Sequence, residues 1–299
     1  MKLLSYRYDC KPHIGILQGA CVYEIPGFSS MNDWILDGCR RQAGSCWHPL
    51  SEVELLAPIP HPMQDVICLG LNYREHAEES ARAAMPSCDS DQEYAAYFSK
   101  RVDEVVPPGG VIDGHFDIVD DLDYEVELAV ILSRDAYHVK KEDALSYVLG
   151  YTILNDVSAR TIQRRHHQWF FGKSLKGFTP MGPWIVTADE IPGLPALDIS
   201  CRVNGEVRQH SNTRQMIFGV DDVIAELSGG MLLKAGTILS MGTPSGVAMG
   251  MSSPRYLKDG DIVECDIEGI GRLTNVVRDT RAAQTTGQKS ADRRKKSIG

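Results

Sequence analysis

The sequence lacks several features that would place it in a broad class of proteins. No stretch reaches eighteen uninterrupted apolar residues, so no helix is predicted to span a membrane. None of the eight cysteines belongs to a C-x-x-C pair, and residues 1–7 are not typical of a signal peptide. We therefore expect a cytoplasmic protein whose thiols are reduced and are mostly small core residues, rather than a secreted disulfide framework.

The sequence also has fewer basic than acidic residues. Lys and Arg total 31 against 40 Asp and Glu, so the formal net charge is −9, which argues against a broad nucleic-acid-binding face. The exception is the stretch 281–299, in which six basic residues accompany one acidic residue. This basic tail has no hydrophobic periodicity. We expect it to be a disordered, solvated terminus, with contact to nucleic acid or an anionic surface as the less favoured alternative.

The remaining composition is that of a globular chain, with 43% hydrophobic and 24% charged residues. The Pro-rich segment 58–62 predicts a linker. We therefore expect a small N-terminal domain over 1–62 and a larger domain over 63–280, before the tail 281–299. Predicted strands outnumber predicted helices and do not alternate regularly with them. This pattern favours a β-rich α+β fold over a doubly wound parallel sheet.

Two carboxylates are predicted on one face of a strand. Glu125 and Glu127 are two residues apart in a segment that alternates in polarity, so their side chains project to the same side. Asp156 follows the apolar run 148–154, at the end of another predicted strand. Three such carboxylates suit a hard cation such as Mg²⁺ or Mn²⁺. The alternatives are a solvated polar face for the glutamates and a helix N-cap for Asp156.

A second group of residues suits proton transfer and charge stabilisation. His76 and Glu79 are three apart on a predicted helix, where a carboxylate orients an imidazole and raises its basicity. An exposed surface pair is the alternative. Lys173, in a G-K-S segment, is a candidate for stabilising an oxyanion, and Thr243, in G-T-P-S-G, is a candidate for holding a carboxylate or phosphate. Each of these two segments alone is more often a simple turn.

These pieces occur in a characteristic order. Between residues 63 and 278, G-L-N-Y-x-x-H-x-x-E is followed by F-x-K, D-Y-E-x-E-L, N-D-V-S-A-R-x-x-Q, G-K-S and G-T-P-S-G. In this order they closely resemble the fumarylacetoacetate hydrolase family. The resemblance implies a mixed β-roll or sandwich fold with a small N-terminal domain, and a homodimer. Two positions depart from the family pattern, namely Lys176 where many relatives have Asp and Arg101 where Pro is common.

The resemblance also implies a role for individual residues. The implied groups are metal ligands for Mg²⁺ or Mn²⁺ (Glu125, Glu127 and Asp156), catalytic residues (His76, Glu79 and Lys173) and substrate contacts (Gln163, Thr243, Lys100 and Arg160). The implied activity is metal-dependent hydrolysis of a C–C bond in acylpyruvate-like or other diketo acids, through a metal-stabilised enolate. The same site supports an oxaloacetate-type decarboxylase or a 2-hydroxydienoate isomerase as alternatives. A catalytically silent binding protein is the least favoured, and segment 76–92 is the expected lid.

Overall fold

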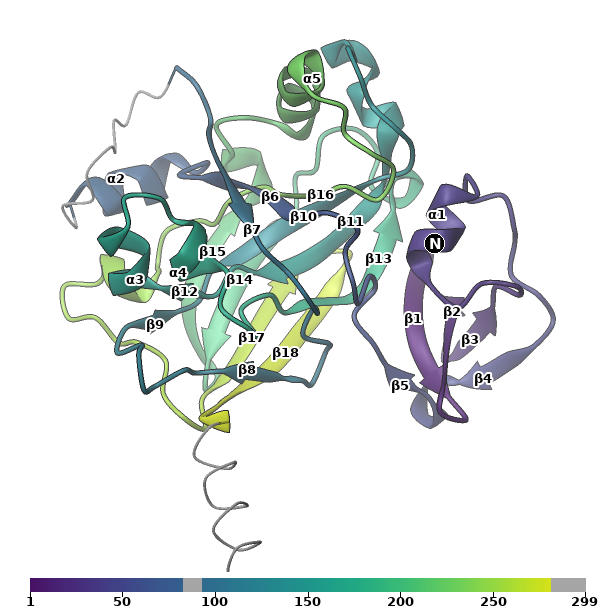
Figure 1. The fold of residues 1–299 in the computed structure, drawn as a ribbon, viewed down its shortest axis with the longest axis horizontal. Helices are drawn as coiled ribbons and strands as arrows, with labels where there is room; N and C mark the ends of the chain where they lie inside the picture. The colour runs from purple at the N-terminus through teal and green to yellow at the C-terminus, as the bar shows by residue number, and fades with distance from the viewer. Residues whose placement is uncertain (83–92, 281–299) are drawn as a thin grey trace, which may run out of the picture.

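A long mixed sheet runs through the molecule (Figure 1). The computed structural model describes residues 1–82 and 93–280, so the basic tail and residues 83–92 of the expected lid lie outside the described residues. In sheet order, the strands are β4 (Trp47–Pro49), β3 (Cys21–Glu24), β2 (Lys11–Gln18), β1 (Lys2–Tyr8), β13 (Met181–Thr187), β11 (Val148–Asn155), β10 (Val126–Leu132), β16 (Ile238–Ser240), β6 (Val66–Gly70) and β7 (Ala96–Lys100), with β5 (Glu54–Leu55) beside β1.

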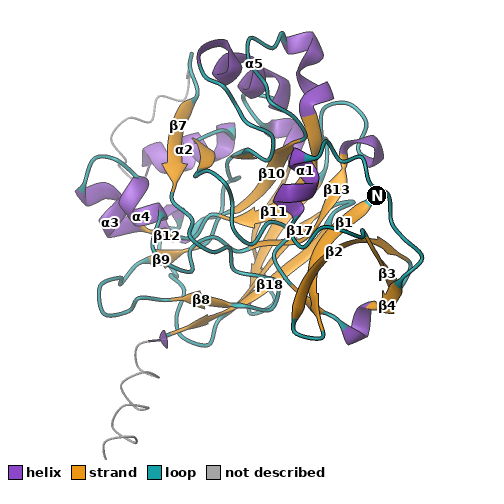
Figure 2. Cartoon of the chain, turned by 45° about the vertical axis from the view of Figure 1, so that its right-hand side comes forward, coloured by secondary structure: helices purple, strands orange, loops and turns teal. Residues whose placement is uncertain are grey.

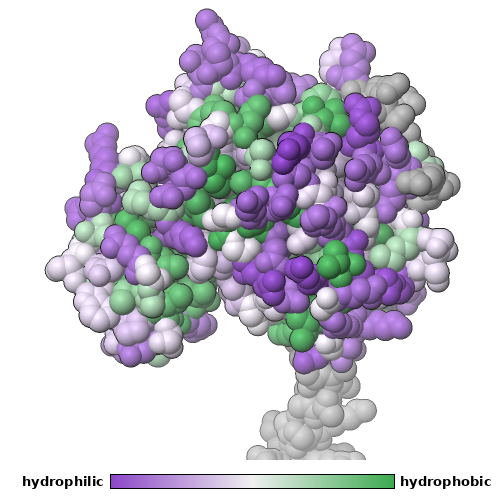
Figure 3. All heavy atoms as spheres, turned by 180° about the vertical axis from the view of Figure 1, so that it is seen from behind, coloured by the Kyte–Doolittle hydropathy of each residue, from purple (hydrophilic) through white to green (hydrophobic). Residues whose placement is uncertain are grey.

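The first strands of the chain form a small lobe with helix α1 (Met31–Leu36) and the short helix η1 (Leu50–Glu52). Figure 3 shows this lobe as a bulge beside the larger body. Its sheet is continuous with the main sheet because β1 pairs antiparallel with β13, Lys2 lying opposite Val186. The lobe is therefore joined to the body by backbone hydrogen bonds as well as by the chain connection.

Strands β10 and β11 are buried on both faces along their whole length. Their sequences are accordingly near-continuous apolar runs, which is what a doubly covered strand requires. The polar residues inside them, Glu127, Thr152 and Asn155, are buried too. Since a buried polar group is costly without a partner, these residues must be held by specific contacts.

A second sheet covers one face of the first. In sheet order it consists of β15 (Glu206–Asn212), β14 (Asp198–Val203), β17 (Ile262–Ile267), β18 (Gly271–Arg278) and β8 (Val111–Asp113). Strands β14 and β17 alternate buried and partly exposed residues, as expected for a sheet with one covered face. Their buried side chains join one hydrophobic core with those of β10 and β11.

Most helices lie at the ends of the sheets (Figure 2). They are α2 (Arg74–Arg82), α3 (Arg160–Arg165), α4 (Phe170–Lys173) and α5 (Val220–Gly230), with the short helices η2 (Lys141–Tyr147), η3 (Ala188–Glu190), η4 (Thr213–Gln215) and η5 (Ala248–Gly250). Strands β9 (Leu122–Asp123) and β12 (Ser158–Ala159) pair with each other near α3. None of the described helices is long and apolar enough to cross a membrane. The expected β-rich α+β fold is confirmed.

Candidate active site

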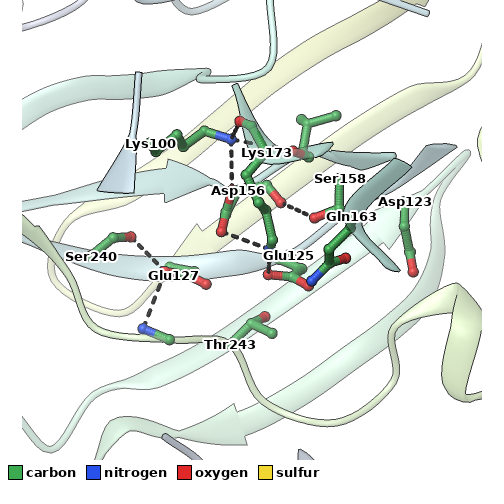
Figure 4. Close-up of polar contacts among 12 residues, drawn as sticks. Lys100, Asp123, Glu125, Glu127, Asp156, Ser158, Gln163, Lys173, Ser240 and Thr243 are labelled. Carbon is green, nitrogen blue, oxygen red and sulfur yellow. Dashed lines mark hydrogen bonds and ion pairs between the residues drawn. The ribbon is translucent and has the colours of Figure 1, made fainter. Parts of the chain in front are cut away.

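Three buried carboxylates meet where β10 and β11 come together (Figure 4). Val126 of β10 lies opposite Asn155 of β11, so Glu125 before Val126 and Glu127 after it lie beside Asp156, which directly follows β11. Their ligand oxygens are all within 4.8 Å of one another. The polar face predicted for the glutamates is therefore not solvated. Asp156 caps no helix, because its carboxylate bonds two lysines instead.

Two buried lysines neutralise part of this charge. The Nζ of Lys173 lies 2.6 Å from Oε2 of Glu125 and 2.8 Å from Oδ2 of Asp156. The Nζ of Lys100 lies 2.6 Å from Oδ1 of Asp156 and also donates to the carbonyl oxygens of Val157 and Lys173. An ammonium has three donors, so Lys100 has none left, whereas Lys173 keeps one.

A buried guanidinium closes the other side of the cluster. Arg160 bonds Glu125 at 2.6 Å and Asp123 at 2.9 Å, and its Nη1 donates to Oε1 of Gln163 at 3.1 Å. Asp123 in turn accepts from the backbone amides of Ala248 and Met249 at the start of η5. The sequence pattern D-Y-E-x-E contained Asp123, but nothing in that pattern distinguished this anchoring role from metal ligation.

Hydrogen bonds with residues of β16, the loop after β16, β10 and β15 hold the side chains of Glu127 and Thr243 in place. The hydroxyl of Ser240 donates to Oε2 of Glu127 at 2.5 Å, and the amide of Gly242 donates to the same oxygen at 3.1 Å. The Thr243 hydroxyl donates to the carbonyl of Val126 and accepts from Nε2 of Gln209, both at about the usual hydrogen-bond length. Nothing in the sequence marked Ser240 or Gln209 for this position.

The electrostatics of the cluster favour a bound cation. Burial opposes ionisation of Glu125, but Lys173 and Arg160 outweigh it and lower the pKa of Glu125 to about 2. Burial, together with the charges of Asp156 and Glu125, raises the pKa of Glu127 well above its usual range. Burial and the two neighbouring carboxylates therefore oppose the charged form of Glu127, and a cation held between the three would relieve this repulsion. An oxygen-only, buried, acidic set of this kind fits a divalent metal ion such as Mg²⁺ or Mn²⁺.

An imidazole–carboxylate pair lies on α2. Nδ1 of His76 is 3.1 Å from Oε2 of Glu79, and both side chains are buried rather than forming a surface pair. The other carboxylate oxygen of Glu79 accepts from the amide of Gly246 at 3.0 Å. Gly250 lies so close that a Cβ there would be 2.2 Å from Cδ of Glu79. The dyad is thus held by the loop that carries the G-T-P-S-G segment.

A cavity connects the dyad with the carboxylates. It is lined by Leu69, Gly70, Leu71, His76, Phe98, Glu125, Glu127, Arg160, Gln163, Trp169, Lys173, Thr243 and Met249. Its aromatic lining consists of Phe98 and Trp169, whose rings pack edge-on, and the Phe98 ring lies 5.3 Å from the Lys173 ammonium. The lining includes neither Lys100, Glu79 nor Asp156, which lie behind the residues that reach the cavity. The other predicted site residues all face it.

Comparisons with known proteins show which family the chain belongs to. A family model described as Fumarylacetoacetate (FAA) hydrolase C-terminal matches residues 65–278. Oxaloacetate tautomerase YisK of Bacillus subtilis (strain 168) is 43% identical over 237 residues, which are 79% of this chain and 77% of that protein.

Two solved structures illustrate the shared fold. A fumarylacetoacetate hydrolase from psychrophilic Exiguobacterium antarcticum has a TM-score of 0.83 and 38% identity, covering 93% of this chain and 99% of its own. A 2-hydroxyhepta-2,4-diene-1,7-dioate isomerase from Mycobacterium marinum has a TM-score of 0.73 and 29% identity, covering 93% and 98%. The family model and these relatives show that the chain belongs to the fumarylacetoacetate hydrolase family.

Proposed function

We propose that the protein is a divalent-metal-dependent tautomerase that interconverts the keto and enol forms of a small 2-oxo dicarboxylic acid of the oxaloacetate type. The observation that carries this proposal is that one cavity is lined both by His76 of the buried histidine–glutamate pair and by Glu125 and Glu127 of the carboxylate triad. A tautomerisation moves one proton between carbon and oxygen, and this arrangement supplies one base and one electrophilic side. The 43% identity with a named oxaloacetate tautomerase supports it. This reaction belongs with the isomerase alternative of the sequence analysis.

His76 is the proposed proton carrier. Because Glu79 pairs with Nδ1, the other ring nitrogen is left as the acceptor in the neutral imidazole. His76 lines the cavity and Glu79 does not. His76 is therefore proposed to contact the substrate, and Glu79 to orient the His76 ring.

The carboxylate triad and Lys173 are the groups proposed to stabilise negative charge on the substrate oxygen. When bound to Glu125, Glu127 and Asp156, a divalent cation would polarise the carbonyl oxygen of a 2-oxo acid. Lys173 has one donor free of the carboxylates and lines the cavity, so it is the proposed donor to a developing enolate oxygen. Lys100, with all three donors used, is proposed to position Asp156 and the Lys173 backbone rather than to contact the substrate.

The test follows the enol absorbance of oxaloacetate with and without Mg²⁺. The expected result is a chelator-sensitive acceleration of enol-to-keto conversion without formation of pyruvate. In deuterated water the enzyme should also speed the exchange of the C3 protons. Pyruvate and CO₂ as enzyme-dependent products would instead support the decarboxylase. A purified, metal-loaded enzyme that accelerates neither reaction would overturn the proposal.

Hydrolysis of a C–C bond in an acylpyruvate remains the second candidate. The observation that favours it is the 38% identity with the Exiguobacterium antarcticum hydrolase over 93% of this chain. In that reaction His76 would deprotonate water, and the same wall would stabilise the enolate that leaves. Release of pyruvate and a free acid from acetylpyruvate, in parallel with the assay above, distinguishes the two.

A further inference from the structure

The small lobe carries a second group of metal-ligating side chains. Glu24, Cys46 and His48 each offer one ligand atom, and these atoms all lie within 4.8 Å of one another. Strands β3 and β4 are at the outer end of the sheet, away from α2 and from β10 and β11, where the carboxylate triad lies (Figures 1 and 2). The group is therefore separate from the active site.

Strand register explains why these side chains converge. Cys46 and His48 lie on either side of Trp47, so they project from the same face of the chain. Val22 of β3 pairs with His48, and the amide of Glu24 donates to the carbonyl of Cys46 at 3.0 Å. Glu24 thus lies across from Cys46 on that same face. The sheet itself, rather than a flexible loop, brings the three together.

The distance between two of the ligand atoms is already close to the distance expected when both bind one metal ion. Sγ of Cys46 and Nε2 of His48 are 3.8 Å apart. In a tetrahedral zinc site with bonds of about 2.3 Å to sulfur and 2.0 Å to nitrogen, these atoms would be separated by about 3.5 Å. Little movement is needed to bind.

Neighbouring rings and a second histidine hold the ligands in place. The ring of His48 stacks on Tyr8 with their centroids 3.8 Å apart. Nδ1 of His13 lies 3.2 Å from Oε1 of Glu24, an outer contact of the kind that orients ligating carboxylates in metal sites. The ligands themselves are partly exposed, which gives an ion a path from solvent.

A buried hydroxyl beside the group lacks a partner. Tyr6 is fully buried, and within the described part of the chain its Oη has no hydrogen-bond partner. The centroid of its ring lies 5.4 Å from that of His13 and 6.2 Å from that of His48. A buried polar atom of this kind is costly unless something bonds it. A water on a bound ion would satisfy it.

We propose that Glu24, Cys46 and His48 bind Zn²⁺ or a similar borderline divalent cation, with a water at the fourth position facing Tyr6. The thiolate and imidazole set this group apart from the oxygen-only triad, because sulfur and nitrogen ligands select zinc-like ions over Mg²⁺. An ion there would join β3 to β4, the outermost strand of the sheet. The proposal is independent of the proposed tautomerase activity.

Cobalt substitution provides the first test. Bound metal is removed from the reduced 299-residue protein with a chelator, which is then dialysed away. Excess Mg²⁺ is added to occupy the triad of Glu125, Glu127 and Asp156, and the protein is then titrated with Co²⁺. The expected result is a near-ultraviolet thiolate-to-cobalt charge-transfer band at one equivalent, which only a site containing cysteine produces. The band should vanish in Cys46→Ser and weaken in His48→Gln. It should persist in Cys10→Ser, the matched control at another exposed cysteine of the same lobe.

Protection of the thiol gives a second readout. At a free Zn²⁺ concentration ten times the Kd, mass action leaves about one site in eleven empty, so alkylation of Cys46 should slow about tenfold. Alkylation of Cys10 should be unchanged. Absence of the cobalt band in the wild-type protein, or its full retention in Cys46→Ser, would overturn the proposal. Circular dichroism of each variant establishes that the lobe remains folded.

Discussion

Lys100 and Asp156 form a fully buried ion pair in which the ammonium lies 2.6 Å from Oδ1 of the carboxylate. The remaining donors of Lys100 are bound by two backbone carbonyls, including that of Lys173. One lysine therefore fixes both a proposed metal ligand and the backbone of the proposed oxyanion donor. Its role in the site is architectural, and it can be tested without an activity assay.

Replacing Lys100 with Met should destabilise the metal-free protein. Removing one partner of a buried pair typically costs about 3–5 kcal/mol, because the other charge is left uncompensated. Added Mg²⁺ should restore part of the loss, since the ion supplies positive charge to the same carboxylate. Urea unfolding with and without Mg²⁺ measures both effects. Lys176→Met is the exposed control and should stay within about 0.5 kcal/mol of wild type.

Metal binding should stabilise the folded chain through Glu127. A ligand present at one hundred times its Kd adds about 2.7 kcal/mol to the free energy of unfolding. Glu127→Gln removes a ligand charge, so most of the Mg²⁺- or Mn²⁺-dependent increase should disappear, together with turnover. Thermal unfolding at several metal concentrations measures this metal-dependent increase in stability. The exposed Glu54→Gln should respond like wild type, and an undiminished response in Glu127→Gln would argue against this metal site.

Glu79→Gln should separate catalysis from metal binding. Loss of the carboxylate that orients His76 should lower kcat by about 10²–10⁴-fold, the range that general acid–base catalysis contributes. Calorimetric Mg²⁺ affinity should stay near wild type, because Glu79 is not part of the triad. Glu75→Gln, on the exposed side of the same helix, is the matched control. Equal activity of the two variants would remove Glu79 from the mechanism.

The cavity wall near Trp169 should be sensitive to a single methyl group. A Cβ at Gly70 would lie 2.0 Å from Cζ3 of Trp169, so Gly70→Ala must displace the indole that packs against Phe98. Overpacking of this kind costs about 1–3 kcal/mol, and the reshaped wall should raise KM. Gly229→Ala, in α5 with no atom near the added Cβ, should instead stabilise by about 0.5–1 kcal/mol. Urea unfolding and steady-state kinetics compare the two.

Cys39 should resist alkylation in the folded protein. Burial, assisted by the charge of Asp37, raises the pKa of Cys39 to about 11 from a usual value of 9.0. Two pKa units lower the thiolate fraction at pH 8 about 100-fold relative to the same thiol in denaturant. Because the folded pKa is the higher one, this contribution to stability is complete below about pH 9 and is lost as the pH rises to about 11. Mass-spectrometric mapping of alkylated cysteines in the folded and denatured protein measures the protection of Cys39.

The sequence predicted most of what local periodicity determines. The strand expected over the apolar run 148–154 is β11, and Glu125, directly before β10, does lie beside Glu127 within β10. The roles of Lys100 and Ser240 were not predictable in the same way. Their partners Asp156 and Glu127 are 56 and 113 residues away, and only the order of strands in the sheet brings them together. A local pattern contains no information about that order.

The expectation that the cysteines are mostly small core residues was only partly met. Cys68, Cys201 and Cys265 are buried, whereas Cys10 and Cys46 are exposed. Cys46 lies 22 residues from Glu24, and the intervening residues include a helix and a loop. Because the cross-strand register between β3 and β4 was not predicted, nothing linked the two in the sequence.

The pairing of β1 with β13 bears on how this chain can be handled in the laboratory. A fragment trimmed to the family-model region, residues 65–278, would leave β13 without the neighbour that now occupies its outer side. Bare strand edges recruit other chains, so such a fragment should self-associate or precipitate. Studies of the catalytic machinery are better served by residues 1–299 together, in which β1 already covers that edge.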